Sequence, residues 1–110
     1  MLTQEQIRMI IDKIAIHYEP ERIILFGSYA NRNATKDSDL DICVIKKTDK
    51  SFLQRSLELR KLIRPIQVAM DLFVFTPNEF EEKKELVNHI AYFANKYGIV
   101  SYEKVHEGVA

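Results

Sequence analysis

Three aspartates whose side chains could share one site are the most informative residues of this 110-residue chain. Asp39 and Asp41 flank a single leucine at the start of an apolar run. In a strand, residues spaced this way point to the same face with their Cα atoms ~6.7 Å apart. Asp71 lies within another apolar run, where strand propensity disfavours aspartate. If the two strands are neighbours with these faces aligned, the three carboxylates converge.

Such a cluster of carboxylates is unfavourable without a cation, because each like-charge pair at ~5 Å and an effective dielectric of ~20 costs ~3 kcal/mol. Oxygen ligands of this kind suit Mg²⁺ or Mn²⁺. Two such ions ~3.5–4 Å apart can clamp the attacking and leaving oxygens of a phosphoryl transfer. A calcium-binding loop starting at Asp37 is disfavoured, because Ile42 and Thr48 stand where that loop needs Gly and Glu. We therefore predict a magnesium or manganese site.

A Gly-Ser pair, Gly27 and Ser28, directly follows an apolar run and is separated from Asp39 by ten intervening residues. We predict a short helix at 28–32. Glycine lets a phosphate approach the backbone closely, and the hydroxyl and N–H groups at a helix start can hold it. One motif would thus bind phosphate, and the other would bind the metal ions that phosphate chelates.

Length, charge and composition favour a single globular domain spanning residues 1–110. The 16 Lys and Arg residues balance 16 Asp and Glu residues, which excludes the globally basic pattern of a stand-alone nucleic-acid binder. The lone cysteine, Cys43, cannot form an internal disulfide and is interpreted as a small buried hydrophobe. No apolar run approaches the ~20 residues that span a bilayer, so we expect a soluble, cytoplasmic protein without a membrane partner.

The elements that must position these residues follow from periodicity and from helix-start signals. A capping box at Thr3 begins a helix that continues to Tyr18, and Thr76-Pro77 begins another. We predict strands at 22–26, 40–45, 67–75 and 99–102, and further helices at 51–64 and 86–97, the last ended by Gly98. This order predicts an α/β (α+β) fold with one mixed β-sheet and helices packed mainly on one face.

The combined motif resembles that of the minimal nucleotidyltransferases (MNT) of the DNA polymerase beta-like superfamily. Their signature is Gly-Ser, ten residues and Asp-x-Asp, matched here by 27–28 and 39–41. Residues 71–77, Asp-Leu-Phe-Val-Phe-Thr-Pro, resemble the family's third-carboxylate strand. The chain departs from the family at 30–32, which reads Ala-Asn-Arg where many members have Ala-Arg-Gly.

The resemblance implies a polymerase beta-like nucleotidyltransferase fold and a Mg²⁺-dependent reaction that uses ATP. By this resemblance, Asp39 and Asp41 hold two Mg²⁺ ions, with Mn²⁺ as a substitute. Asp71 binds the catalytic metal and helps to deprotonate the attacking hydroxyl. Gly27 and Ser28 hold the triphosphate. The metal ions stabilise charge on the α-phosphate and on the departing pyrophosphate.

The same resemblance suggests a partner. Small MNT proteins typically pair with a HEPN protein as a toxin–antitoxin system, and some transfer AMP from ATP to a tyrosine of the HEPN toxin. The His-x-Tyr motif of HEPN proteins is absent here, so the HEPN toxin would be a separate chain encoded nearby. We therefore expect an antitoxin that adenylylates its toxin, as a homodimer or in a hetero-oligomer with HEPN chains. Two alternatives stay open: neutralisation by binding alone, or transfer to a small-molecule acceptor.

The remaining polar residues favour structural roles. His17, His89 and His106 lack metal-ligand spacing, so we expect them at the surface or in helix packing. Tyr29 could stack near the nucleotide or pack against the fold. Basic residues concentrate in 46–64, which forms either a solvated helix face or a surface that faces a partner or RNA.

Overall fold

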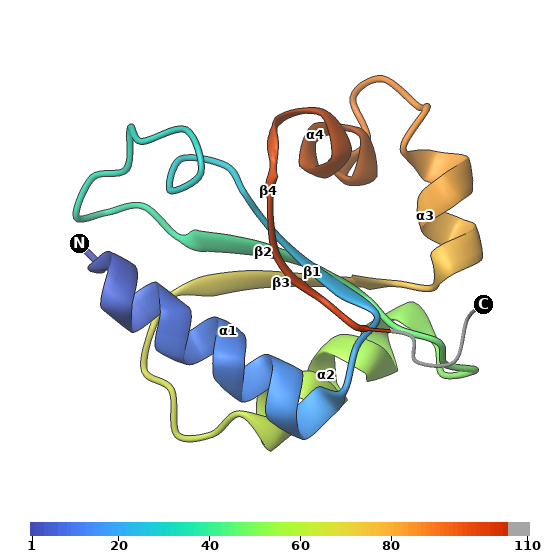
Figure 1. Cartoon of the computed structure of the whole chain (residues 1–110), viewed down its shortest axis with the longest axis horizontal. Coiled ribbons are helices and arrows are strands. Elements are labelled where there is room, and N and C mark those ends of the chain that lie inside the picture. Colours follow the sequence, from blue (N-terminus) through green and yellow to red (C-terminus); the bar gives the residue numbers. More distant parts are fainter. Residues whose placement is uncertain (106–110) are drawn as a thin grey trace.

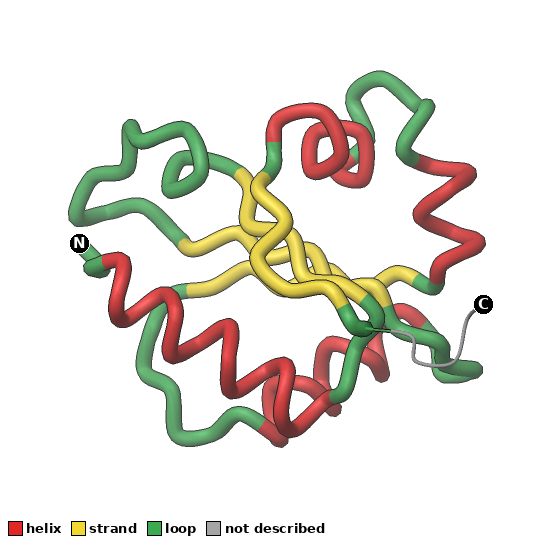
Figure 2. The backbone as a smooth tube through the Cα atoms, viewed as in Figure 1, coloured by secondary structure: helices red, strands yellow, loops and turns green. Residues whose placement is uncertain are grey.

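The computed structural model describes residues 1–105, so the prediction for His106 lies outside the described residues. The elements are α1 (Gln4–Tyr18), β1 (Arg22–Phe26), β2 (Leu40–Ile45), α2 (Phe52–Leu62), β3 (Met70–Phe75), α3 (Pro77–Lys83), α4 (Ile90–Tyr97) and β4 (Ile99–Glu103). The strands form one sheet in the order β3-β2-β1-β4. Strands β2 and β3 are parallel and the other pairs are antiparallel, which confirms the predicted mixed sheet (Figures 1 and 2).

The first three helices begin at capping boxes. In α1, the Thr3 hydroxyl accepts a hydrogen bond from the Gln6 N–H at 3.1 Å, and the Gln6 side chain accepts one from the Thr3 N–H at 2.8 Å. The pairs Ser51–Gln54 and Thr76–Glu79 do the same for α2 and α3. Because these bonds satisfy N–H groups that a helix leaves without partners, the side chains fix where each helix starts.

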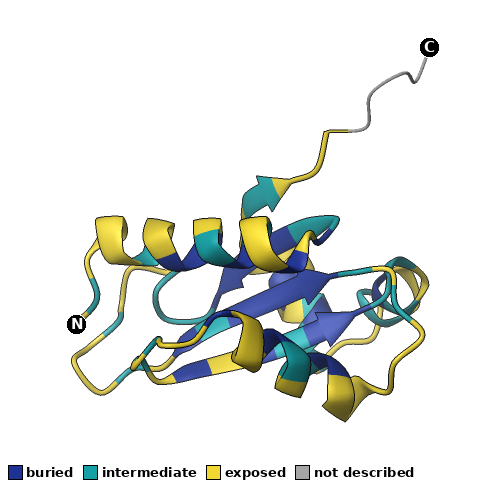
Figure 3. Ribbon diagram, turned by 90° about the horizontal axis from the view of Figure 1, so that it is seen from below, coloured by how far each residue is buried: buried dark blue, intermediate teal, exposed yellow. Residues whose placement is uncertain are grey.

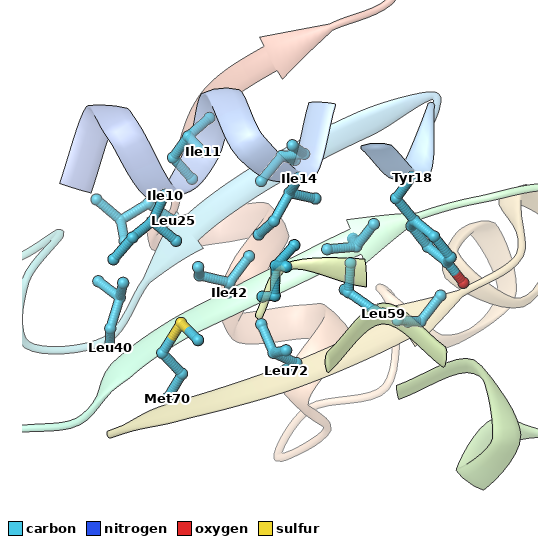
Figure 4. Close-up of a cluster of buried hydrophobic side chains, with 14 residues drawn as sticks. Ile10, Ile11, Ile14, Tyr18, Leu25, Leu40, Ile42, Leu59, Met70 and Leu72 are labelled. Atoms are coloured by element: carbon cyan, nitrogen blue, oxygen red, sulfur yellow. The ribbon is translucent and has the colours of Figure 1, made fainter. Parts of the chain in front are cut away.

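One face of the sheet is covered by the two longer helices, α1 and α2, and carries the larger of two clusters of buried apolar side chains. Figure 4 shows the side chains that meet there, and Figure 3 shows the buried strands beneath exposed helix surfaces. Fully burying an aliphatic side chain of this kind contributes ~1.5–3 kcal/mol. The buried members are Ile10, Ile11, Ile14, Tyr18, Ile23, Leu25, Leu40, Ile42, Val44, Leu59, Ile63, Met70, Leu72 and Val74.

The opposite face is covered by the two shorter helices, with α4 against β1 and α3 against β3. Helices therefore lie on both faces, and the predicted one-sided packing holds only in the sense that the longer helices share a face. The second core is smaller and richer in aromatic rings: it contains Ile24, Phe26, Cys43, Ile45, Phe75, Phe80, Ala91 and Ala94. The short helices leave the beginnings of β2 and β3 less covered, since Asp41 is half-buried and Asp71 is exposed.

Two predicted boundaries were wrong by three residues or more, and α2 ends two residues before the predicted end at 64. The strand predicted at 67–75 begins at Met70, because β3 pairs only with β2, and β2 itself begins at Leu40, the register partner of Met70. The helix predicted from Leu86 begins at Ile90, because Asn88 has a left-handed backbone (φ 76°) that interrupts it. Within residues 1–105, no helix is both long and apolar enough to traverse a lipid bilayer.

Candidate active site

The parallel pairing of β2 with β3 sets two of the predicted aspartates side by side. In this register Asp41 is the direct partner of Asp71, and both point to the face that carries the aromatic core. Paired strands lie ~4.8 Å apart, so the two carboxylates are neighbours across the sheet. The two strands are therefore neighbours with their acidic faces aligned, which is the condition under which the carboxylates converge.

The surroundings of Asp41 disfavour the charged form of its carboxyl group. Burial raises the pKa of Asp41 from 3.8 to about 6, aided by the negative charge of Asp71, by a side-chain hydrogen bond with Asp71 and by the charge of Asp39. Among residues 1–105, no lysine or arginine forms an ion pair with Asp41 or Asp71. The pair is thus a concentration of negative charge that the fold does not neutralise.

Asp39 takes a different position from the other two. It lies one residue before β2 begins, is exposed, and acts on Asp41 through its charge. Within the described part of the chain, no three His, Cys, Asp or Glu side chains are arranged to hold a metal ion by themselves. Of the three predicted ligands, the structure therefore brings Asp41 and Asp71 together and leaves Asp39 at the rim.

The donor set nevertheless fits Mg²⁺ arriving with a nucleotide. Mg²⁺ keeps several waters and is usually bound through one or two carboxylates together with substrate phosphates, not by an all-protein cage. The half-buried Asp41 and the exposed Asp71 supply two such carboxylates, and Asp39 lies within electrostatic range of the pair. A divalent cation would also remove the repulsion between them.

Gly27 is required at the end of β1 for two reasons. Its backbone is left-handed, with φ of 75°, a conformation that glycine adopts at little cost. A Cβ atom at this position would also lie 2.2 Å from Oδ2 of Asp41. Because Phe26 is the register partner of Asp41, the chain turns directly beside the carboxylate. The Gly-Ser turn and the acidic pair are therefore one continuous site.

The segment after Gly27 is a turn, so the short helix predicted at 28–32 was wrong. The Gly27 carbonyl accepts a hydrogen bond from the Asn31 N–H at 3.0 Å, and the Ser28 carbonyl accepts one from the Asn33 N–H at 3.1 Å. A left-handed residue, Arg32 with φ of 61°, ends the turn. Ser28 is half-buried at the start of this turn, beside the glycine.

Arg32 explains how the loop accommodates its departure from the family motif. It occupies the position at which the resembled family often has glycine, and it holds the positive φ that glycine favours. The loop therefore keeps a left-handed backbone at position 32, although the residue there is arginine and not glycine. For a residue other than glycine, this conformation costs roughly 1–2 kcal/mol.

Two residues for which sequence left alternatives open have structural roles. Tyr29 packs against the aliphatic core below the sheet, and its hydroxyl accepts a hydrogen bond from the Leu2 N–H at 3.1 Å. His89 caps α4, with Nδ1 accepting from the Ala91 N–H at 3.0 Å. The structure thus supports the packing role for both.

Most basic side chains of the segment 46–64 are exposed, as on a solvated helix face, but Arg55 is used inside the fold. Arg55 is buried, forms an ion pair with Glu79 at 2.6 Å and donates to the Val74 carbonyl at 3.3 Å. Arg60 donates to the Met70 carbonyl at 2.8 Å. Neither predicted alternative, a solvated face or a partner surface, describes Arg55, because its charge joins α2 to α3.

Comparisons with known proteins identify the class of this fold and the domain family of the chain. The structure is similar to the crystal structure of a "putative nucleotidyltransferase" from Sulfolobus solfataricus, with a TM-score of 0.61 and 19% sequence identity over 89% of this chain and 78% of that chain. At this identity the likeness concerns the fold. The family model for the nucleotidyltransferase domain matches residues 7–106, so the chain belongs to the nucleotidyltransferase domain family. A search of curated proteins gave no significant match.

The alternation along β3 predicts that Phe73 and Phe75 share the face of Asp71, but the sequence gives these aromatic side chains no functional role. Phe73 and Phe75 follow Asp71 at alternate positions of β3 and line a cavity together with Phe52 and His89. The contributions of Phe52 and His89 depend on tertiary packing, which no local pattern predicts.

Proposed function

We propose that this chain is a Mg²⁺-dependent adenylyltransferase that transfers AMP from ATP to a tyrosine hydroxyl of a HEPN toxin, and thereby acts as the antitoxin. The observation that carries the proposal is the Asp41–Asp71 pair in direct register beside the left-handed Gly27. Membership of the nucleotidyltransferase domain family supports nucleotidyl transfer in general. The tyrosine acceptor and the HEPN partner come from the resemblance to minimal nucleotidyltransferases.

In the proposed reaction, the acceptor oxygen forms a bond to the α-phosphorus of ATP. The bond from that phosphorus to its bridging oxygen breaks, and pyrophosphate leaves with the electron pair. The hydroxyl proton passes to Asp71, which is the exposed member of the pair and lies on the edge strand β3. Gly27 and Ser28 hold the triphosphate. When held by Asp39, Asp41 and Asp71, Mg²⁺ supplies positive charge that stabilises the phosphate oxygens.

The direct test is transfer of label from ATP labelled at the α-phosphate to the purified HEPN product of the neighbouring reading frame. We expect label on that protein in the presence of Mg²⁺, and loss of at least ~10³-fold in the Asp41→Asn variant. Asp37→Asn is the matched control, because Asp37 is an exposed aspartate of the same loop outside the pair. Absence of label, or full labelling by Asp41→Asn, would contradict the proposal.

Neutralisation by binding alone remains the competing function, and one observation favours it. Asp39 is exposed and the described carboxylates do not complete a metal site without substrate. Toxin protection by an Asp39→Ala/Asp41→Ala double variant, equal to that of the unmodified chain, would support binding without catalysis. Loss of protection together with loss of label would support the adenylyltransferase.

A further inference from the structure

A cavity of about 430 Å³ lies on the same face of the sheet as the Asp41–Asp71 pair. We call it the aromatic cavity, because four rings line it together with one aliphatic and two charged side chains: Phe52, Phe73, Phe75, His89, Ile90, Glu79 and Lys83. These residues come from α2, β3, α3 and the beginning of α4, which Figure 1 shows as separate parts of the chain. Four rings around one opening are suited to binding a flat aromatic group.

The rings are held in fixed relative orientations. The centroid of Phe75 lies 5.5 Å from that of Phe52 and 5.7 Å from that of His89, with interplanar angles of 40° and 53°. His89 is anchored by its capping hydrogen bond to the Ala91 N–H. Such tilted pairs are favourable ring arrangements, so the walls form without a ligand.

The lining also includes one carboxylate whose charge is already compensated. Glu79 lines the aromatic cavity, and the guanidinium of Arg55 donates to both of its oxygens, at 2.6 and 3.2 Å. The hydrogen bonds from Arg55 are the main reason that the pKa of Glu79 lies below its usual range, and hydrogen bonds from Thr76 lower it further. The ion pair therefore fixes this part of the wall, and the rings face a ligand together with the half-buried Lys83.

The aromatic cavity begins next to the acidic pair. Asp71, Phe73 and Phe75 occupy alternate positions of β3, so Phe73 follows Asp71 on the same face at a Cα separation of ~6.7 Å. Gly27 lies against Asp41, on the β1 side of the pair. The sheet order therefore places Gly27, Asp41 and Asp71 in sequence toward the β3 edge, and Phe73 lies further along β3 with its ring centroid 6.0 Å from that of Phe26.

We propose that the aromatic cavity binds the tyrosyl ring that carries the acceptor hydroxyl, which makes it the determinant of acceptor type; this rests on the proposed function. In an in-line displacement, the attacking oxygen approaches from the side opposite the leaving pyrophosphate. When the triphosphate is held at Gly27 and Ser28, at the end of β1, the side of the α-phosphate from which the acceptor approaches faces β3. A tyrosine whose hydroxyl reaches Asp71 can lay its ring along Phe73, whereas a serine is too short to reach the rings.

A nuclear magnetic resonance titration tests this without requiring catalysis. The probe is N-acetyl-L-tyrosinamide, compared with N-acetyl-L-serinamide and adenosine. We expect tyrosinamide to shift the resonances of Phe73, Phe75 and His89, and serinamide not to. Phe52→Ala should weaken tyrosinamide binding about tenfold, while Leu53→Ala is the matched control, an exposed neighbour on the same helix outside the cavity.

The outcomes separate this proposal from the proposed function. Tyrosinamide shifts that Phe52→Ala weakens and Leu53→Ala preserves support the acceptor cavity, whether or not a HEPN protein is labelled. The proposal would be overturned if tyrosinamide caused no shifts or if serinamide caused equal shifts. Displacement of tyrosinamide by adenosine would also overturn it, because the cavity would then be a nucleobase site. Because Phe52 is 49% and Leu53 67% exposed, both variants are expected to fold.

Kinetics give a second readout if the HEPN protein is the acceptor. Phe52→Ala should then raise KM for the protein acceptor about tenfold, with KM for ATP and kcat unchanged. Phe52→Tyr, which keeps the ring, should restore the original KM. A rise in KM for ATP instead would contradict binding of the acceptor in this cavity.

Discussion

Alternate residues of the same strands build two faces of very different chemistry. Ile42 is fully buried under α1 and α2, whereas its neighbour Asp41 is half-buried on the opposite face and opposes another carboxylate. The aliphatic face supplies stability through burial. The other face holds a pair of carboxylates that lowers stability, and it holds the aromatic cavity. Because most apolar packing lies on one face, the fold stays stable although the other face keeps a carboxylate pair and a cavity, which suit substrate binding and not stability.

The largest expected effect comes from the aliphatic face. Ile42→Ala should reduce the free energy of unfolding by about 3 kcal/mol, because it opens a cavity among fully buried side chains. Urea unfolding measures this loss. Nucleotide binding should persist where the variant remains folded, and Ile42→Val, which removes one methyl group, should lose only about 1 kcal/mol. Loss of nucleotide binding by a fully folded Ile42→Ala protein would show that the two faces are not separable.

Gly27→Ala should affect both stability and the site. The added Cβ would meet the Asp41 carboxylate at 2.2 Å on a left-handed backbone, so we expect a stability loss of about 2 kcal/mol and loss of nucleotide binding. Thermal unfolding and calorimetric titration check the two effects. The Gly27→Ala/Asp41→Ala double variant removes the collision and should recover part of the stability. Simple additivity of the two substitutions would show that this contact is not responsible.

The acidic pair should make stability depend on pH. The folded state raises the pKa of Asp41 from 3.8 to about 6, so it binds more protons than the unfolded chain between these values. The free energy of unfolding should therefore fall as pH rises from about 4 to about 6. After allowance for solvent screening of this partly exposed group, we expect Asp41→Asn to be more stable by about 1 kcal/mol at pH 8.

The comparison that checks this prediction is the same unfolding measurement at pH 8 and near pH 3.5. At the lower pH the Asp41→Asn variant should nearly match the unmodified protein, because Asp41 is protonated in the folded state and mostly protonated in the unfolded chain. An Asp41→Asn protein that is less stable at pH 8 would mean that the carboxylate contributes favourably to the fold. Asp37→Asn is the control for changes in net charge alone.

The smallest expected effect concerns the loop. Arg32→Gly should stabilise the protein by about 0.5 kcal/mol, because relief of the left-handed backbone is partly offset by the greater flexibility of glycine when unfolded. A small rise in Tm measures it. Asn31→Gly is the matched control, since the adjacent Asn31 has no positive φ and should lose stability on the same change.

The sequence predicted the acidic site better than its surroundings. Asp41 and Asp71 could be matched because strand periodicity fixes which residues share a face, and only the pairing of the strands had to be assumed. The turn after Gly27 could not be predicted from the sequence. Its last residue, Arg32, has a left-handed backbone, whereas arginine as a residue type favours a right-handed helix. The burial of Arg55 was also unpredictable, since its partner Glu79 lies 24 residues away. Local patterns specify faces, whereas charge pairing across elements requires the fold.

The most direct test of the account is the location of nucleotide binding, measured by nuclear magnetic resonance with Mg²⁺ and a non-hydrolysable ATP analogue. We predict that Gly27, Ser28, Asp41 and Asp71 shift, that residues of the α1–α2 face do not, and that Asp41→Asn loses the Mg²⁺-dependent part. Shifts confined to the α1–α2 face, or Mg²⁺-dependent binding unchanged in Asp41→Asn, would contradict the assignment of this face as the nucleotidyl-transfer site.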